Sequence, residues 1–374
     1  MTTAATAALE RLLEAYRSPG PLDTPTEPVI GYVGQDVPEE ILTAAGARAL
    51  RLRGSPGWDT GRADTYLGTG LDPAVRALLA GLLDQRFGPL AGVVVSSDCD
   101  ASQRLFYVMR EIHRVEPGTA LPPVHLVDVL HLPRPSTLRY NVTRLRQLQA
   151  VVEEWTGRRV TAQQLAAAVT AHNAERRGYR EMAALRRSHP PRLSGQEALA
   201  VLGVKGRLPL GELVTLLTDL AGGEGLPERA GRRVFVTGSS HDSTGVYREI
   251  ERRGAVVVGE DHDHGELHVG ADVREATLEA LAERYRDNGP TPHRASMQER
   301  AEHTAAAVRR TGAELLLSYA RERDDAPAWD VPHQAAAVGV RTATLTAQPY
   351  GAVDPAALEQ ALTGDQPAEQ EARA

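Results

Sequence analysis

Ala91-Gly-Val-Val-Val-Ser-Ser-Asp-Cys-Asp100 is the segment of this chain that most clearly indicates its fold. Consecutive valines are typical of a strand buried on both faces, because such a strand has no polar alternation. The residues that follow repeat apolar side chains at helical spacing as far as His113. Cys99, the only cysteine, is therefore expected at the carboxyl end of a buried strand, close to a helix start. Ligands of open α/β sheets bind at that edge, and a helix N-terminus favours a thiolate. The alternative is a small buried apolar residue.

Strands and helices alternate in both directions from this segment. The alternation predicts parallel sheets with helices on their faces. A helical stretch from Ser136 to about Leu202 separates two alternating units. The expected fold class is therefore α/β, with two doubly wound, Rossmann-like parallel-sheet domains joined by a helical segment. The expected strands are residues 29–33, 49–52, 93–95 and 124–130 in the first unit and 232–238, 255–259, 313–318 and 341–345 in the second.

This pattern divides the chain into four parts. We expect an N-terminal helix and linker in residues 1–27, a first α/β domain with a helical extension in residues 28–205, and a second α/β domain in residues 206–360. The polar residues 361–374 are expected to form a disordered tail. A cleft between two such domains is a usual ligand site.

Composition narrows the functional classes. The 374 residues carry a net charge of −7 without any basic run, which argues against a nucleic-acid surface. No stretch approaches the roughly 20 apolar residues of a membrane span, and the first residues lack a signal-peptide pattern. One cysteine excludes an internal disulfide and a cysteine-only metal site. We expect a cytoplasmic protein that binds neither nucleic acid nor membrane.

Two polar loops of the second unit carry the candidate substrate contacts. Residues 260–268 read Glu-Asp-His-Asp-His-Gly-Glu-Leu-His and follow an expected buried strand. Their imidazoles and carboxylates suit a metal or a substrate contact, and a solvated polar loop is the alternative. Residues 237–245 carry small hydroxylated side chains between a strand and a helix, where backbone N–H groups bind a phosphate or the side chains simply cap the helix. The candidate substrate-binding residues are Ser239, Ser240, Asp261, His262 and His264.

Two side chains are candidates for catalysis. His241, in the loop of residues 237–245, is the candidate for proton transfer, because imidazole titrates near neutral pH. Ser97 stands where the valine strand becomes polar, at the ligand-binding edge of the sheet. The alternative for His241 is a polar loop histidine without a chemical role.

Several segments resemble the 2-hydroxyacyl-CoA dehydratase and benzoyl-CoA reductase family. Residues 31–46, Gly-Tyr-Val-Gly-Gln-Asp-Val-Pro-Glu-Glu-Ile-Leu-Thr-Ala-Ala-Gly, resemble its opening motif, and residues 97–100, Ser-Asp-Cys-Asp, resemble its central motif. The similar segments run in the same order from about residue 28 to residue 346. The chain is thus similar to the 2-hydroxyglutaryl-CoA dehydratase D-component. The remaining similar segments are residues 127–134, 254–261 and 329–332.

The resemblance implies a specific biochemistry. Subunits of this family have two α/β domains and commonly pair as heterodimers. Three cysteines hold a [4Fe–4S] cluster between the domains, and an ATP-driven activator supplies single electrons. The substrate is an acyl-CoA thioester, and the chemistry passes through a ketyl-type radical. We therefore expect a homologous subunit as partner, in a homo- or heterodimer, and an acyl-CoA or another small molecule as substrate.

This chain departs from the family at the cluster cysteines. The first of them precedes a proline at a helix start, where Asp72 stands; the second is Cys99; the third falls at Asp324, or at Asp325 if the register shifts by one. Thiolates hold iron–sulfur clusters, whereas carboxylates are hard ligands that suit magnesium, manganese or iron(II). The resemblance thus predicts a divergent member without a [4Fe–4S] cluster of its own. Asp72, Cys99 and Asp324 either hold a single divalent metal or are a relic of the cluster site.

Three functions remain open from the sequence. The first is a cluster-free subunit that supports a cluster-bearing homologue. The second is a repurposed enzyme that uses a mononuclear metal or an acid–base pair of His241 and His264 in the cleft. The third is a non-catalytic protein that binds an acyl-CoA or a nucleotide.

Overall fold

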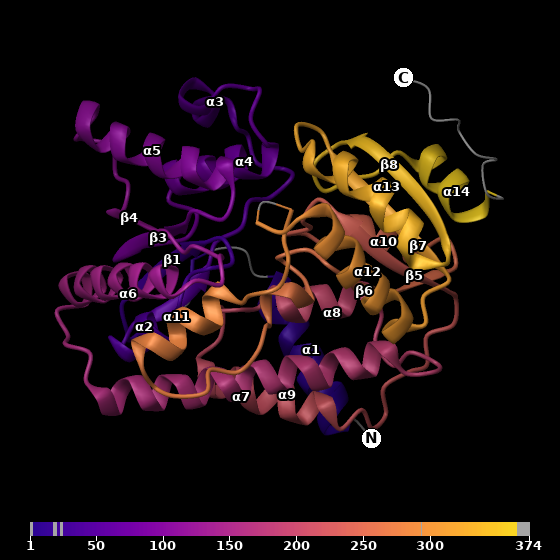
Figure 1. Ribbon diagram of the computed structural model, residues 1–374, viewed down its shortest axis with the longest axis horizontal. Helices are drawn as coiled ribbons and strands as arrows, with labels where there is room; N and C mark the ends of the chain where they lie inside the picture. The colour runs from indigo at the N-terminus through magenta and orange to yellow at the C-terminus, as the bar shows by residue number, and fades with distance from the viewer. Residues whose placement is uncertain (1–2, 18–20, 23–24, 293, 365–374) are drawn as a thin grey trace.

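The computed structural model describes residues 3–17, 21–22, 25–292 and 294–364 (Figure 1). Two sheets lie side by side, and the long helix α7 (Ala162–Arg187) runs below both. Every neighbouring pair of strands is parallel, and helices cover both faces of each sheet. The predicted α/β class with two Rossmann-like units is confirmed.

The two sheets share one topology. Each places its second strand at one edge, followed by the first, third and fourth strands. The central strands are buried along nearly their whole length, which is why they contain continuous apolar runs. The first sheet contains β2 (Arg48–Arg51), β1 (Val29–Val33), β3 (Gly92–Ser96) and β4 (Val124–Val127); the second contains β6 (Ala255–Glu260), β5 (Arg232–Gly238), β7 (Leu315–Arg321) and β8 (Arg341–Gln348).

Alternate residues of the first sheet face two separate cores. Ile30 and Val94 point to a core shared with α2 (Glu39–Ala44) and α6 (Pro135–Thr156). Val29, Val93 and their neighbours point to the opposite core. That core is closed by α3 (Gly61–Leu67), α4 (Pro73–Leu83) and α5 (Asp100–Val115), of which α3 is not apparent in the sequence pattern.

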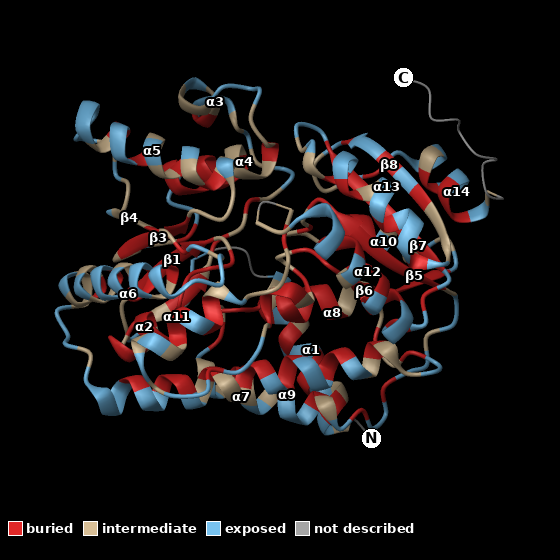
Figure 2. Cartoon of the chain, viewed as in Figure 1, coloured by how far each residue is buried: buried red, intermediate tan, exposed pale blue. Residues whose placement is uncertain are grey.

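The second sheet is covered in the same way. Val234 and Leu315 face one core, and Phe235 and Leu316 face the other. Figure 2 shows the buried strands between helices whose outer faces are exposed. The first core involves α8 (Gly195–Leu202), α10 (Gly245–Glu251) and α14 (Pro355–Thr363), and the second involves α12 (Met297–Thr311) and α13 (Ala326–Val338).

The helical segment is a third packing unit. Leu12 of α1 (Ala4–Arg17) packs with Leu213 and Leu217 of α9 (Leu210–Ala221) in a core that also includes residues of α7 and α8. The N-terminal helix is therefore part of the folded structure. Since α7 contacts both α2 and β6, this unit joins the two sheets.

Two helices pack across the domain boundary that the sequence suggests, between residues 205 and 206. Helix α11 (Leu278–Arg286) lies in the range expected for the second domain, yet Leu281 and Tyr285 pack into the first core with Ile30. Conversely, α8 lies before residue 206 and packs against β6 and α10. The apolar face of a helix shows that it packs, but not on which sheet.

The end of the chain is folded further than expected. Helix α14 continues to Thr363 because Ala361 and Leu362 are buried against the second sheet. The rest of the expected tail, residues 365–374, lies outside the described residues. Among the described helices, none has the length and apolarity needed to cross a membrane.

The placement of α11 makes a prediction about stability. Leu281→Ala should lower the free energy of unfolding by about 2–5 kcal/mol, because it leaves a cavity in the first core. Urea unfolding measures this loss, with Glu283→Ala on the exposed face of the same helix as the matched control. Hydrogen exchange should accelerate in β1 and α2. Acceleration confined to β5–β8 would contradict the assignment of α11 to the first sheet.

Candidate functional site

The carboxyl ends of both sheets open onto one cavity of about 650 Å³. Strands β1, β3 and β7 end at this cavity. Gly34 follows β1, Asp98 and Cys99 follow β3, and Arg321 is the last residue of β7. Parallel sheets bind ligands at this edge, so the cavity is the candidate site. It is also lined by residues after β5 and β6, namely Ser240, Asp242, His262, Asp263 and His264.

The three candidate metal ligands all line this cavity, but they do not form a ready-made metal centre. Asp72, Cys99 and Asp324 come from the start of α4, the start of α5 and the turn after β7. Among the described residues, only one group of three has all its donor atoms within 4.8 Å of one another, and it lies elsewhere. Joint metal ligation by these three residues therefore stays a prediction.

Asp72 is engaged in two ways. Its Oδ1 accepts the N–H of Ala74 at 2.9 Å, so it is the N-cap of α4 that the Asp-Pro sequence predicts. Both its oxygens also bind Arg321, with Nε 2.9 Å from Oδ1 and Nη2 2.6 Å from Oδ2. A fork of this kind is among the stronger interactions of a carboxylate.

The surroundings of Cys99 favour the thiol over the thiolate. Its sulfur caps α5 by accepting the N–H of Ser102 at 3.3 Å. Burial raises the pKa of the thiol to about 12, with the charge of Asp98 as the next cause. Desolvation thus outweighs the helix N-terminus.

The serines of the 237–245 loop are used within the protein. Ser239 is buried, and its hydroxyl donates to Asp324 at 2.6 Å while accepting the N–H of Arg321 at 2.9 Å. Ser240 lines the cavity, but its hydroxyl donates to Asp263. These contacts fix the turn after β7 and the loop after β6.

The two candidate catalytic residues lie outside the wall of the main cavity. His241 is 4% exposed and stacks near Tyr319, with ring centroids 4.5 Å apart. Burial, then the neighbouring His262, lowers the pKa of His241 well below its ordinary value. Ser97 donates to Asp128 at 2.6 Å.

The histidines after β6 are better placed. His262 and His264 line the cavity, whereas Asp261 is buried behind it and accepts the hydroxyl of Thr304. Within the described residues His264 has no hydrogen-bond partner, so its imidazole is available to a ligand. Burial, then Arg51, lowers the pKa of His264 well below its ordinary value, which keeps the ring neutral.

Three features of the site escaped the sequence analysis. Arg321 looks like an ordinary strand residue, and Arg51, which holds Asp263 at 3.0 Å, also lies in a strand. Asp98 precedes the cysteine, and its carboxyl fits beside Gly34 because a Cβ there would lie 2.7 Å from Oδ1. Burial, then Asp36, raises the pKa of Asp98 to about 7. Of these three residues, only Asp98 could have been found from the sequence, because it lies in the motif around Cys99.

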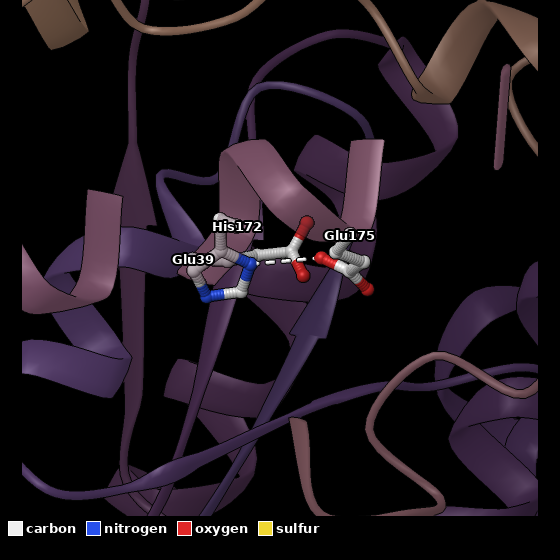
Figure 3. A group of neighbouring side chains, drawn as sticks. All are labelled: Glu39, His172 and Glu175. Carbon is white, nitrogen blue, oxygen red and sulfur yellow. Dashed lines mark hydrogen bonds and ion pairs between the residues drawn. The ribbon is translucent and has the colours of Figure 1, made fainter. Parts of the chain in front are cut away.

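A second cluster of ionisable groups lies between α2 and α7. Glu39, His172 and Glu175 form the group with donor atoms within 4.8 Å (Figure 3). His172 Nδ1 is 2.8 Å from Glu175, and its Nε2 is 2.9 Å from the hydroxyl of Thr43. The dashed line in Figure 3 marks the first of these contacts.

A cation from the chain already lies within this cluster. The ammonium of Lys205, the only lysine in the sequence, lies 2.6 Å from Glu39 and 3.7 Å from Glu175. It also lies 2.9 Å from His268 Nε2. Burial alone would raise the pKa of Glu39, but Lys205, His268 and His172 together outweigh it and hold that pKa well below its ordinary value. The carboxylates of this cluster therefore already have a cation from the protein itself.

Comparison with known proteins gives two findings. The family model of the 2-hydroxyglutaryl-CoA dehydratase D-component matches residues 35–328, which is most of the chain and spans both sides of the cavity. The chain is also similar to the protein named "Putative dehydratase subunit YjiM" of Escherichia coli (strain K12). The two are 26% identical over 282 residues, which cover 69% of each chain.

The Lys205 cluster predicts the effect of removing its cation. Lys205→Met should lower the free energy of unfolding by about 3–5 kcal/mol at neutral pH, because it leaves Glu39 and Glu175 buried without a counter-charge. Since the pKa of Glu39 is depressed in the fold, this stabilisation exists above the ordinary carboxyl pKa and is lost as the pH falls below it. The difference between wild type and variant should therefore shrink in acid.

Urea unfolding across that pH range checks both statements. Arg177→Met, which removes an exposed cation of α7, is the matched control and should change the stability little. A Lys205→Met difference that is small at neutral pH, or that grows in acid, would contradict the assignment.

Proposed function

Because the chain belongs to the family of the 2-hydroxyglutaryl-CoA dehydratase D-component, we propose that it is a subunit of a 2-hydroxyacyl-CoA dehydratase-type system that carries no [4Fe–4S] cluster. The ion pair of Asp72 with Arg321 is the observation that carries this proposal. Asp72 stands where the family has a cysteine, and its carboxylate is occupied by the guanidinium of Arg321.

The donor set of the cleft does not fit a four-iron cluster. Such clusters are held by several thiolates, and Cys99 is the only cysteine. Both oxygens of Asp72 bind Arg321, and Asp324 accepts the hydroxyl of Ser239. The part of this chain is therefore to bind and orient the substrate and to support a partner that carries the cluster.

The cavity wall suits an acyl-CoA thioester. Arg104 and Arg323 are exposed, line the cavity, and make no ion pair among the described residues, so they are available to the anionic phosphates of coenzyme A. His264 offers a neutral imidazole to the acyl end. The two arginines come from opposite halves of the cleft, on α5 and after β7.

A homologous subunit is the proposed partner. D-component proteins normally pair with another subunit. Large apolar side chains are exposed on one flank of the first sheet, around its edge strand β4, and these are Tyr107, Leu130, Leu132 and Tyr140. An unpaired strand edge with exposed apolar neighbours favours docking of another chain.

His264 favours a second candidate, a repurposed acid–base enzyme. A neutral imidazole without a partner in a cavity is suited to proton transfer. Turnover by the isolated chain, without a homologue or an activator, would favour this candidate over the supporting subunit. Binding without turnover in either setting would favour a non-catalytic acyl-CoA-binding protein.

Substrate binding is the first test. Titration calorimetry with 2-hydroxyglutaryl-CoA should show saturable binding to the full chain, weakened about tenfold or more by Arg104→Ala/Arg323→Ala. Arg177→Ala, on the exposed face of α7, is the matched control and should bind like wild type. Absence of binding to wild type, or equal binding by all three proteins, would contradict the proposal.

Cluster content is the second test. Anaerobic reconstitution with iron and sulfide should give no broad visible band, and wild type and Cys99→Ser should be indistinguishable. The reason is that one cysteine cannot supply the several thiolates that hold such a cluster. A band that bleaches on reduction, with about four irons per chain and lost in Cys99→Ser, would overturn the cluster-free assignment.

A further inference from the structure

Arg321 is held on every nitrogen of its guanidinium. Nε and Nη2 bind Asp72, and Nη1 donates to the carbonyl of Ser240 at 2.7 Å. The side chain is 6% exposed although it lines the cavity. Three of the five N–H donors of this buried guanidinium are therefore committed to the protein, which fixes its position in the cavity wall.

Carboxylates from both halves of the molecule act on this cation, Asp72 in direct contact and Asp242 and Asp324 from farther away. Asp72 belongs to the first half, and Asp242 and Asp324 belong to the second. Burial alone would lower the pKa of Arg321, but these three carboxylates, Asp72 first, outweigh it and raise that pKa. The guanidinium is therefore a permanent charge at the bottom of the cleft.

The surrounding aspartates have few other counter-charges. Asp324 accepts a neutral hydroxyl from Ser239, and Asp242 accepts one from Tyr350 at 2.5 Å. Partly buried carboxylates grouped in this way are stabilised by a nearby cation. Arg321 is such a cation and is part of the chain.

We propose that Arg321 is the resident cation of the cleft. Its guanidinium, which is part of the chain, occupies the place that an inorganic centre has in relatives with three cysteines. It joins the two halves through Asp72 and denies the cavity's carboxylates to a metal ion. This inference rests on the proposed function, which equates this cleft with the cofactor cleft of the family. The Lys205 cluster is a second case in which a cation of the chain lies among carboxylates, here an ammonium near Glu39 and Glu175.

The inference predicts that a metal site appears when the cation is removed. Arg321→Ser removes the cation that binds Asp72 and acts on Asp242 and Asp324, and it leaves a space the size of a guanidinium beside Asp72. At slightly alkaline pH these carboxylates should take up a divalent ion, whereas the wild-type cleft should take up none. Co²⁺ is the probe, because its visible spectrum reports the type and number of its ligands.

The experiment titrates Co²⁺ into the full chain and its variants. Wild type and Arg177→Ser, the control that removes an exposed arginine, should show no saturable binding. Arg321→Ser should bind about one Co²⁺ per chain, and Asp72→Asn/Arg321→Ser should lose it. Should Arg321→Ser not fold, Arg321→Gln, which keeps a donor for the Ser240 carbonyl, takes its place.

Two outcomes would overturn the inference. One is saturable Co²⁺ binding by wild type that Asp72→Asn abolishes, since Arg321 would then not exclude a metal. The other is the absence of binding by folded Arg321→Ser or Arg321→Gln. The titration uses neither acyl-CoA nor a partner, so its failure leaves the calorimetric test of the proposed function standing, and the reverse also holds.

Discussion

The cleft depends on buried charges that pair across the two halves of the molecule. Asp72 at the start of α4 binds Arg321 at the end of β7, and Arg51 of β2 binds Asp263 after β6. Loss of one partner of a buried pair leaves the other without compensation, at a cost of about 3–5 kcal/mol. The two sheets therefore hold a fixed relation because opening the cleft would separate these charges.

These pairs also decide which groups a ligand meets. Arg51 binds both the carboxylate and the backbone carbonyl of Asp263, which fixes the turn that presents His264 to the cavity. Arg321, through its amide and Nη1, fixes the backbone and side chains of the 237–245 loop, so that His241 lies behind the wall. The polar segment after β6 faces the ligand, while the hydroxyls after β5 serve the structure.

The sequence predicts what depends on local pattern. Continuous apolar runs located the strands, and the Asp-Pro sequence located the start of α4, because burial and capping leave a mark within a few residues. The position of α11 and the partner of Asp72 leave no such mark. Asp72 and Arg321 are separated by 249 residues, and the residues around Arg321 do not show that its side chain binds Asp72. His241 was expected at the site for its chemistry, and packing against Tyr319 places it elsewhere.

The two internal cations also explain why each residue type is found where it is. Asp72 offers two oxygens in one plane, which the planar fork of Arg321 matches with two parallel bonds. Lys205 is within hydrogen-bond distance of Glu39 and His268 and lies 3.7 Å from Glu175, and a compact ammonium with three rotatable donors suits such separate acceptors. The single lysine of the sequence stands at this cluster. At both sites the donors of the internal cation therefore match the arrangement of the acceptors around it.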